Sequence, residues 1–240
     1  MIDFHAHIIP GIDDGAKTVH ESVDMLRMLS SQGINKVVAT PHFYPGEITP
    51  EEFFKKREEG LRLILDEKEK LAPKEELPKI AKGAEFFFFP LIYSFNDIEK
   101  FCIEGTDYLL LEMPFVKWHP SFFDSLHKLI TNRGITPIIA HIDRYFSFGN
   151  GKNEVNKLKE LGALLQINAE AFNFFLSRRK ALSLVKKSVI DVIGSDCHNL
   201  DARKPEIDKA IFSVKKRLGK EQVTKIATFS EEILANANFF

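Results

Sequence analysis

Short apolar segments typical of β-strands recur along the chain, and longer segments with helical spacing of apolar residues separate them. The apolar segments are Ile2–His5, Lys36–Thr40, Ile80–Phe89, Tyr108–Glu112, Thr136–Ala140, Ala163–Asn168 and Ile190–Ser195. In Val19–Ser31, for example, Val19, Val23 and Leu26 are spaced for one apolar face of a helix. Strands that alternate with helices predict right-handed βαβ units and a parallel sheet.

Seven such strands predict either a barrel one unit short of the common eight or an open doubly wound sheet, and we favour the barrel. Gly134 and Gly162 each stand between a helical segment and the next strand, where left-handed C-caps are expected. No linker divides the chain, so we expect one domain over residues 1–240. The Glu- and Lys-rich segment Glu51–Lys82 predicts a solvated helix with i,i+4 ion pairs followed by a loop, the alternative being a lid or partner surface.

Composition excludes several classes of protein. The 33 basic and 34 acidic residues give a net charge of −1, which predicts no attraction to nucleic acid. No apolar run approaches the roughly 20 residues of a membrane-spanning helix, and the chain opens directly on Ile2–His5, so we expect neither membrane insertion nor a leader. The two cysteines, Cys102 and Cys197, fit a reducing compartment and predict a cytoplasmic protein.

Aromatic residues are unusually frequent. The 22 phenylalanines, with the run Phe86–Phe89, predict a phenylalanine-rich core rather than an aromatic binding surface. The tail from Leu234 to Phe240 predicts a frayed helix end, the alternative being that Phe239 and Phe240 dock on the barrel.

Histidines and carboxylates gather where the predicted strands end. Because the carboxyl ends of all strands in a parallel barrel share one rim, side chains from distant parts of the sequence converge there. The residues at these positions, or in the turn after the first strand, are His5, His7, Asp14, His42, Glu85, Glu112, His141, Asp196 and His198.

This set predicts a metal site. His5 and His7 form a His-x-His pair whose side chains leave the same face of a strand and can reach one cation. Nitrogen and oxygen ligands without cysteine suit Mn, Fe, Zn or Co. The residues outnumber the ligands that one ion uses, so we expect two or three divalent ions, an arrangement that activates water for displacement at phosphorus.

Two arginines and several aromatic residues are predicted near the same rim. Arg144 follows His141 by three residues and Arg203 follows His198 by five, so each could bind a phosphate bidentately or form a structural ion pair. The aromatic residues predict either a wall for an aromatic leaving group or packing at the rim. They are Phe43, Tyr44, Phe115, Trp118, Tyr145 and Phe146.

Other candidates receive plainer interpretations. Cys197 to Arg203 has the C-x5-R spacing of a cysteine-dependent phosphatase, but the intervening residues lack glycine and Asp201 would repel a phosphate dianion. Cys197 is therefore interpreted as an incidental neighbour of two metal ligands. His20, His119 and His127 are interpreted as surface or capping residues. Substrate contact is an alternative for His119.

At this point a resemblance is evident. The motifs MIDFHAHIIPGIDDGAKT, ATPHFYPG, KGAEFF, LLLEMPF, IIAHIDRY and GSDCHNLDAR resemble the PHP (polymerase and histidinol phosphatase) superfamily. Within it, the chain is most similar to the bacterial metal-dependent protein-tyrosine phosphatases of the CpsB/CapC/YwqE type, encoded with capsule and exopolysaccharide genes. The motifs span residues 1 to about 205, and HIIPGIDDGAKT and HIDRY are the most specific. The resemblance implies a distorted (β/α)7 TIM-like barrel, the PHP fold.

The resemblance also implies a trinuclear centre, usually containing manganese. The ligand sets that it implies for the three ions are, in turn, His5, His7, Glu85 and Asp196; Glu85, Glu112 and His141; and Asp14, His42 and His198. Arg144 and Arg203 match the positions of the family's phosphate-binding arginines, and Asp143 stands where relatives often have Glu.

The implied activity is hydrolysis of phosphotyrosine by a metal-bridging hydroxide, on a bacterial tyrosine kinase that controls capsule or exopolysaccharide synthesis. A phenolate, with a parent pKa of about 10, leaves readily enough to need no dedicated general acid. Two alternatives stay open: a PHP phosphoesterase for a small phosphomonoester such as histidinol phosphate, and a metal-loaded regulator that binds phosphotyrosine without turnover. No feature of the sequence specifies an oligomeric state.

Overall fold

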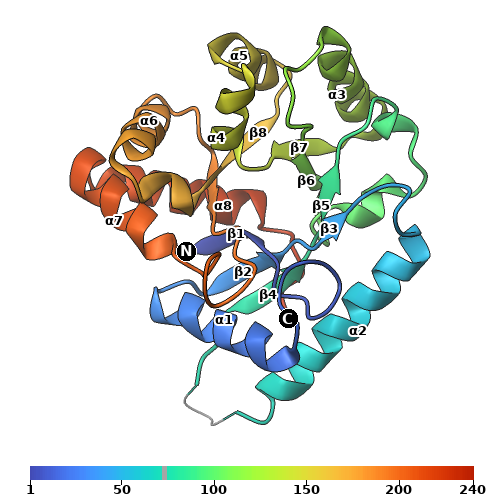
Figure 1. The fold of residues 1–240 in the computed structure, drawn as a ribbon, viewed down its shortest axis with the longest axis vertical. Coiled ribbons are helices and arrows are strands. Elements are labelled where there is room, and N and C mark those ends of the chain that lie inside the picture. Colours follow the sequence, from blue (N-terminus) through green and yellow to red (C-terminus); the bar gives the residue numbers. More distant parts are fainter. Residues whose placement is uncertain (72–74) are drawn as a thin grey trace.

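Strands and helices alternate along the chain in the computed structural model, which describes residues 1–71 and 75–240 (Figure 1). The strands are β1 (Ile2–Ala6), β2 (Lys36–Ala39), β3 (His42–Phe43), β4 (Lys79–Lys82), β5 (Glu85–Phe87), β6 (Tyr108–Glu112), β7 (Thr136–Ile139), β8 (Leu164–Asn168) and β9 (Val192–Gly194). The α-helices are α1 (Val19–Ser31), α2 (Pro50–Lys68), α3 (Pro120–Arg133), α4 (Ile142–Tyr145), α5 (Lys152–Glu160), α6 (Phe175–Lys186), α7 (Ile207–Leu218) and α8 (Lys220–Ile233). Short 3-10 helices are η1 (Ile92–Ser94), η2 (Ile98–Phe101), η3 (Phe146–Phe148) and η4 (Ala169–Phe172).

The strands form a curled parallel arrangement. One sheet has the order β1-β2-β4 and a second the order β3-β5-β6-β7-β8-β9, with every pair parallel. The two sheets are continuous along the chain, because β3 follows β2 and β5 follows β4 after two-residue breaks. β9 returns to β1 through hydrogen bonds from Asp196 N–H to His5 O (2.7 Å) and from His7 N–H to Cys197 O (2.9 Å). The predicted distorted barrel is thus confirmed over the open doubly wound sheet.

One predicted strand is interrupted, and a neighbouring strand continues, after a break, past its predicted end at Thr40. The predicted Ile80–Phe89 strand divides into β4 and β5, and its neighbour ends as β2 and resumes as β3. Pro41 lies in the break, and it has no N–H to donate to a ladder. Across the break, the two neighbouring segments stay joined by backbone hydrogen bonds from Gly83 N–H to Ala39 O (2.9 Å) and from Glu85 N–H to Pro41 O (3.0 Å). Beyond the break, His42 pairs in register with Glu85.

Side-chain and glycine caps set the helix boundaries. The Thr18 hydroxyl accepts the Glu21 N–H (3.2 Å) where α1 begins, so the predicted limits of this helix are confirmed. α3 ends at Gly134, whose φ of 67° is left-handed, as predicted. Gly162, after α5, likewise has a φ of 88°.

α2 occupies the first part of the charged segment Glu51–Lys82. It is the predicted solvated helix, with an i,i+4 ion pair of 3.1 Å between Lys56 and Glu52 on its exposed side. Its inner side buries Phe53 completely. Pro73, in the predicted loop that follows, lies outside the described residues.

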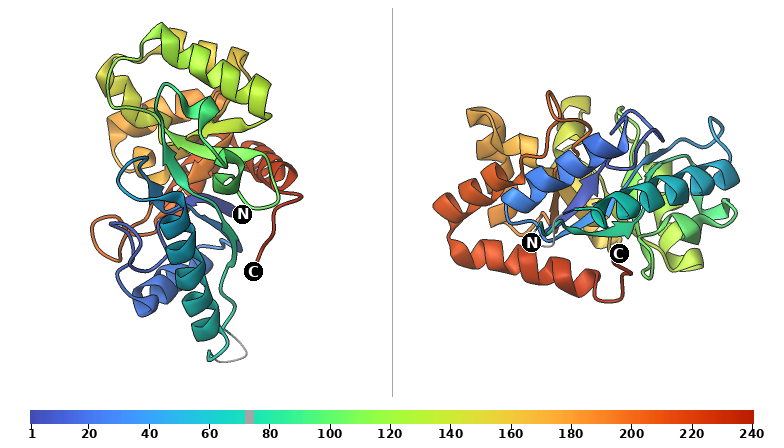
Figure 2. Two further views of the ribbon diagram at one scale, coloured as in Figure 1. Left: turned by 90° about the vertical axis from the view of Figure 1, so that its right-hand side faces the viewer. Right: turned by 90° about the horizontal axis from the view of Figure 1, so that it is seen from below.

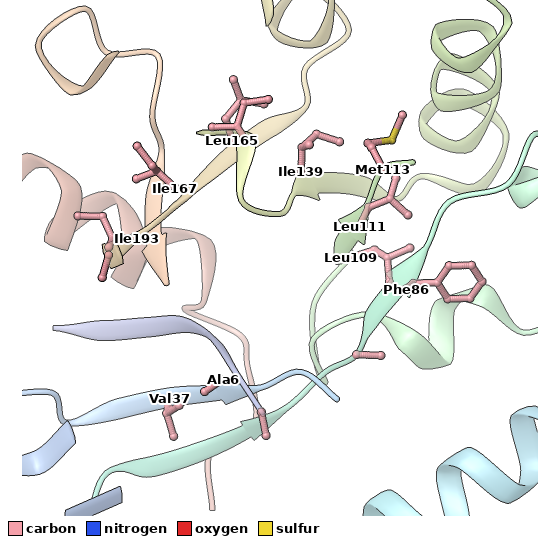
Figure 3. Close-up of a cluster of buried hydrophobic side chains, with 14 of the residues drawn as sticks. Ala6, Val37, Phe86, Leu109, Leu111, Met113, Ile139, Leu165, Ile167 and Ile193 are labelled. Atoms are coloured by element: carbon pink, nitrogen blue, oxygen red, sulfur yellow. The ribbon is translucent and has the colours of Figure 1, made fainter. Parts of the chain in front are cut away.

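The larger hydrophobic cluster fills the space between the strands and the surrounding helices (Figure 3). Phe43, Phe53, Phe86 and Phe101 are fully buried in it, and the rings of Phe43 and Phe101 are 4.3 Å apart. The phenylalanine-rich core is therefore confirmed, and it occupies the side of the barrel covered by α2.

A smaller cluster closes the end of the barrel where the strands begin. Ile2 and Val192, near the amino ends of β1 and β9, pack there with Ile233 and Leu234 from the end of α8. Figure 2 (right) shows α8 along the lower edge of the molecule. Within residues 1–71 and 75–240, no helix has both the length and the apolar character needed to span a membrane.

The tail after α8 docks on the barrel. Phe240 N–H bonds Ile80 O (2.9 Å) and Ile80 N–H bonds Phe240 O (3.0 Å), so the tail runs antiparallel beside β4. Lys36 Nζ lies 5.0 Å from the ring centre of Phe239. The expectation of a frayed end was wrong, because backbone pairing with β4 holds the terminal residues.

Candidate metal centre

Four of the predicted ligands converge in one buried group at the carboxyl end of the barrel. The Nε2 atoms of His5 and His7 are 3.0 Å apart. The Nε2 atom of His5 is 3.1 Å from Glu85 Oε2 and 3.4 Å from Asp196 Oδ1. The Nε2 atom of His7 is 3.3 Å and 3.5 Å from the same two oxygens. Separations of this size arise when ligand atoms each stand about 2.1 Å from one ion.

A second group surrounds Asp14. Its Oδ1 is 3.3 Å from His198 Nε2 and 3.6 Å from His42 Nε2, and an atom of His7 lies within the same group. The Asp14 side chain is 64% exposed, so this group lies on the solvent side of the buried one.

Glu85 links the buried group to Glu112 and His141. His141 Nε2 lies 2.9 Å from Glu85 Oε1 and 3.6 Å from Glu112 Oε1. His42 also reaches this region, with Nδ1 at 2.9 Å from Glu85 Oε2. His42 thus faces two of the three groups, and its assignment to the third ion stays a prediction.

Buried polar atoms without partners indicate that cations fit here. Glu85 Oε2 and His198 Nε2 are buried and accept no hydrogen bond from the described residues. An unpaired buried polar group costs about 1–3 kcal/mol, more when charged. Glu85 Oε2 nevertheless faces three imidazole nitrogens, from His5, His7 and His42. Divalent cations would satisfy these atoms together, so the residues present fit the expected metal ions.

The electrostatics favour the metal-binding forms of Glu85 and His198, whereas at His141 burial is outweighed by hydrogen bonds to Glu112 and Glu85, which raise its pKa to about 9. Burial opposes charge on Glu85, but His5 and His42 outweigh it and hold the pKa of Glu85 well below its ordinary value. The carboxylate therefore stays ionised. Burial, followed by His7 and Arg203, lowers the pKa of His198 to about 3, so its imidazole is neutral at pH 7.

Two of these residues have a strained backbone. His141 (φ 32°) and Asp196 (φ 55°) adopt left-handed conformations, which non-glycine residues rarely hold. Each costs of order 1–3 kcal/mol and persists only where the surroundings fix it. The His141 N–H donates to Gln166 Oε1 (2.6 Å), and the Asp196 N–H to the β1 backbone. Such strain is typical of functional positions.

Asp13, which the sequence does not distinguish from its neighbour Asp14, orients a predicted ligand. Its Oδ2 accepts from His7 Nδ1 (2.7 Å) and from the His42 N–H (2.9 Å). A proton held on Nδ1 leaves His7 Nε2 free to bind an ion. The turn continues at Gly15, where a Cβ would lie 2.3 Å from His7 O. Only glycine fits this approach, so the GIDDG turn shapes the site.

β8 supplies no predicted ligand, yet its two amides join three of them. Gln166 Oε1 accepts from His5 Nδ1 (3.3 Å) as well as from the His141 backbone. Gln166 Nε2 donates to Asn168 Oδ1 (2.9 Å), and Asn168 Nδ2 donates to Asp196 Oδ2 (2.8 Å). Sequence reasoning missed this amide pair. The signal was two polar residues spaced i,i+2 in a buried apolar strand.

Both predicted arginines contact the same carboxylate. Arg144 Nη2 is 2.8 Å from Asp196 Oδ2, and Arg203 Nη2 is 2.8 Å from Asp196 Oδ1. Their side chains remain 32% and 34% exposed. The ion-pair alternative is thus present in the structure, and the partly open guanidiniums adjoin the buried ligand group.

Two hollows open beside the centre. One, of about 340 Å³, is lined by Asp14, His42 and Tyr44, and the Tyr44 hydroxyl donates to Glu112 Oε2 (3.2 Å). The other, of about 200 Å³, is lined on one side by Asp196 and Arg203.

The predicted aromatic wall is divided between the core and the site. Phe43, Trp118 and Tyr145 are buried in the core. Tyr44 lines a hollow, and Phe115 stacks on His141 at 5.7 Å with an interplanar angle of 17°. Packing in the core therefore accounts for half of the six residues, and Phe146 is half-buried against the same core.

The remaining candidates follow the plainer interpretations. Cys197 is fully buried, and burial with nearby Asp3 and Asp196 raises the pKa of its thiol well above the ordinary value. His20 and His127 are exposed on α1 and α3. His119 caps α3 by accepting the Ser121 N–H (3.3 Å), as predicted.

Comparison with known proteins gives a consistent result. The family model for capsular polysaccharide synthesis, CpsB/CapC, matches residues 1–235. The tyrosine-protein phosphatase YwqE of Bacillus subtilis (strain 168) is 30% identical over 247 residues, covering 100% of this chain and 94% of its own.

Solved structures agree with the fold. One describes YwqE from Bacillus subtilis and CpsB from Streptococcus pneumoniae as unique metal-dependent tyrosine phosphatases; its match has a TM-score of 0.81 at 25% identity, covering 100% of this chain and 96% of that one. A histidinol phosphate phosphatase of Lactococcus lactis, solved with zinc, L-histidinol and phosphate, matches with a TM-score of 0.54 at 15% identity, covering 90% of this chain and 92% of that one. The second likeness shows the fold alone.

Proposed function

Because the chain belongs to the CpsB/CapC family of capsular polysaccharide synthesis, we propose that it is a metal-dependent protein-tyrosine phosphatase. The observation that carries the proposal is the position of Asp196. Its carboxylate faces the buried histidines His5 and His7 on one side and both guanidiniums, Arg144 and Arg203, on the other. Groups suited to cations and groups suited to a phosphate dianion therefore adjoin at one place.

Two or three divalent ions, with manganese expected and Fe, Zn or Co also suited, would be held by the clustered side chains. The proposed ligands are His5, His7, Asp14, His42, Glu85, Glu112, His141, Asp196 and His198. When bound, such ions act as Lewis acids and lower the pKa of coordinated water, which supplies a nucleophile near neutral pH.

The chain's own groups bind and orient the phosphate. Arg144 and Arg203 carry fixed positive charge at the open side of Asp196, where they can engage the equatorial oxygens of a phosphoryl group. The Tyr44 hydroxyl, in the hollow on the other side, helps hold Glu112 in place. Asp13 and the β8 amides keep the histidine rings in the tautomer and direction that a cation requires.

The proposed substrate is a phosphotyrosine-containing protein, and the finer proposal is a bacterial tyrosine kinase that controls capsule or exopolysaccharide synthesis. Support comes from the family description and from the relatives' names, which are tyrosine-protein phosphatases. A cytoplasmic location, expected from the buried free cysteines Cys102 and Cys197, stays a prediction. Hydrolysis of histidinol phosphate and binding without turnover remain the competing outcomes of the test.

Phosphate release from a tyrosine-phosphorylated peptide tests this function. We expect activity with manganese, loss after chelation and recovery when manganese is restored. His141→Ala should abolish turnover, since His141 contacts Glu85 and Glu112, whereas His127→Ala, an exposed histidine on α3, should not. Faster hydrolysis of histidinol phosphate than of the peptide would overturn the protein substrate. Peptide binding without phosphate release under every metal would overturn the enzyme.

A further inference from the structure

Three consecutive large apolar side chains stand in solvent just beyond the rim. Phe174, Phe175 and Leu176 are 71%, 70% and 72% exposed, the highest values among the large hydrophobic residues of the described chain. We call these three residues the apolar tip. Runs of exposed apolar residues are unfavourable in a water-facing loop unless they serve binding.

The apolar tip also weakens the helix that it begins. Phe174 is the N-cap of α6, and its side chain makes no capping hydrogen bond. Replacing a serine, threonine, asparagine or aspartate cap by an apolar residue costs about 1 kcal/mol. Phe175 and Leu176 then occupy the first turn without being buried. Local structure therefore gains nothing from these side chains, which points to a role outside the folded chain.

The apolar tip is continuous with the candidate centre. Phe174 lines the hollow of about 200 Å³ whose other lining residues include Asp196 and Arg203. A volume of about 150 Å³ is enough for a benzene-sized group, so one apolar side chain of a ligand fits beside Phe174. A ligand that occupies this hollow therefore lies between residues of the candidate centre and Phe174 of the apolar tip.

The charges around the apolar tip select the kind of ligand. α6 carries Arg178, Arg179, Lys180 and Lys186 and no acidic residue. Among the residues that line the hollow, Glu206 pairs with Lys204 at 3.3 Å and with a second lysine at 2.9 Å, and Glu170 also lines it. The basic helix beside an apolar patch is complementary to an acidic chain that also carries an apolar side chain.

We propose that the apolar tip docks the polypeptide segment flanking the phosphotyrosine, and that it selects substrates with a large apolar residue close to the phosphotyrosine in an acidic sequence. This inference rests on the proposed phosphatase function and adds a substrate class to it. A peptide is favoured over a membrane surface or a second copy of this chain because Phe174 shares the hollow with Arg203. The other two occupants are outcomes of the test.

The test compares the manganese-loaded wild type with Phe174→Ser/Phe175→Ser/Leu176→Ser. Phe212→Ser, on α7 and 62% exposed, is the matched control. The substrates are free phosphotyrosine and two phosphotyrosyl peptides of equal net charge, one with leucine and one with glycine beside the phosphotyrosine. For each protein, kcat/KM for the leucine peptide is divided by kcat/KM for free phosphotyrosine. We expect this ratio to be about tenfold lower in the triple variant than in the wild type, mainly through a higher KM for the peptide. The ratio for the glycine peptide and all ratios of the control should not change.

Binding of a fluorescein-labelled phosphonate analogue of the leucine peptide is measured in parallel. If the wild type hydrolyses none of these compounds, the proposed function fails, but weaker binding of the analogue by the triple variant would still support docking. Equal ratios and equal binding in both proteins would overturn the inference. If the peptide ratios stay equal, two further results would also overturn it. One is sedimentation with phosphatidylglycerol vesicles of the wild type but not of the triple variant, and the other is an oligomeric wild type that the triple substitution converts to a monomer.

Discussion

Asp196 is the residue on which both parts of the proposed site depend. Burial opposes its charge, but His5, His7 and Arg144 hold the pKa of this carboxyl well below the ordinary value. Its oxygens are thus shared between the buried histidines and the arginines. A guanidinium that leaves Asp196 to bind phosphate also leaves a free carboxylate for the ions. Phosphate binding and metal binding are therefore compatible at this residue.

Substitution of Arg203 separates its two predicted roles. We expect Arg203→Ala to lower kcat/KM for a phosphotyrosyl peptide about 10²–10³-fold, because a donor to the developing charge is lost. Arg203→Lys should recover only part of this, since an ammonium cannot bind bidentately. Bound manganese, measured after gel filtration, should not decrease in either variant. A loss of manganese that accounts for the loss of activity would instead assign Arg203 a structural ion-pair role with Asp196.

Cys197 is a residue whose substitution should leave the activity nearly unchanged. Its thiol is buried with a raised pKa, so little thiolate forms at neutral pH. We expect Cys197→Ser to keep activity within a few-fold of wild type. Iodoacetamide at pH 8 should label neither this residue nor Cys102, whose pKa burial raises to about 12, as checked by mass spectrometry. Inactivation that parallels labelling of Cys197 would favour the thiol mechanism that the C-x5-R spacing suggests.

At the scale of elements, β8 joins the other strands to the centre without contributing a ligand. The inward positions Gln166 and Asn168 connect His5, His141 and Asp196, which come from three other parts of the barrel. A neighbouring strand thereby fixes the directions of ligands that it does not provide. Outer partners of this kind typically account for 10–100-fold in metal affinity.

Gln166→Leu should therefore weaken manganese binding about 10–100-fold while the barrel stays folded. Gln166→Glu keeps an oxygen that can accept from His5 Nδ1 and the His141 N–H, so it should bind manganese more tightly than Gln166→Leu. The measurement is the rise in thermal midpoint with manganese concentration. Ile167→Val, on the same strand but in the hydrophobic cluster, is the control. It should lower stability by about 1 kcal/mol and leave the manganese dependence unchanged. Equal manganese dependence in all of these proteins would exclude a positioning role.

The elements also indicate what the sequence could and could not predict. Strand positions and the convergence of histidines at one rim followed from apolar spacing and from the parallel βαβ pattern. The breaks that separate β2 from β3 and β4 from β5 did not, because they depend on how two neighbouring segments pair, with Gly83 N–H bonding Ala39 O and Glu85 N–H bonding Pro41 O. The role of Asp13 was missed because two adjacent aspartates cannot be told apart until their partners are known. The role of Gln166 was missed because the i,i+2 spacing of polar residues on β8 does not specify which ligands they contact. The left-handed backbone at His141 likewise has no sequence signature.

At the scale of the whole molecule, the barrel is closed at the end opposite the centre by α8 and the tail. The tail contributes two backbone hydrogen bonds between Phe240 and Ile80 and the partial burial of Phe239 beside Lys36. Deleting residues 235–240 should lower the free energy of unfolding by about 2–3 kcal/mol. Urea unfolding measures this loss. Activity at low temperature should persist, since the predicted ligands lie at the other end of the strands. An unchanged urea midpoint would show that the tail does not stabilise the barrel.

The same deletion tests whether residues 1–240 fold as one domain, which we propose from the closure of β9 on β1 and the packing of α8 against both strands. Trp118 is the only tryptophan, and it packs on Tyr145 with ring centres 5.0 Å apart in the loop between β6 and α3. In a single cooperative unit, loss of the tail from β4 destabilises the region around Trp118 by as much as the rest of the chain. Tryptophan fluorescence and far-ultraviolet circular dichroism should therefore give coincident urea transitions that shift together. A fluorescence transition that stays in place while the dichroism transition moves would divide the chain into two units.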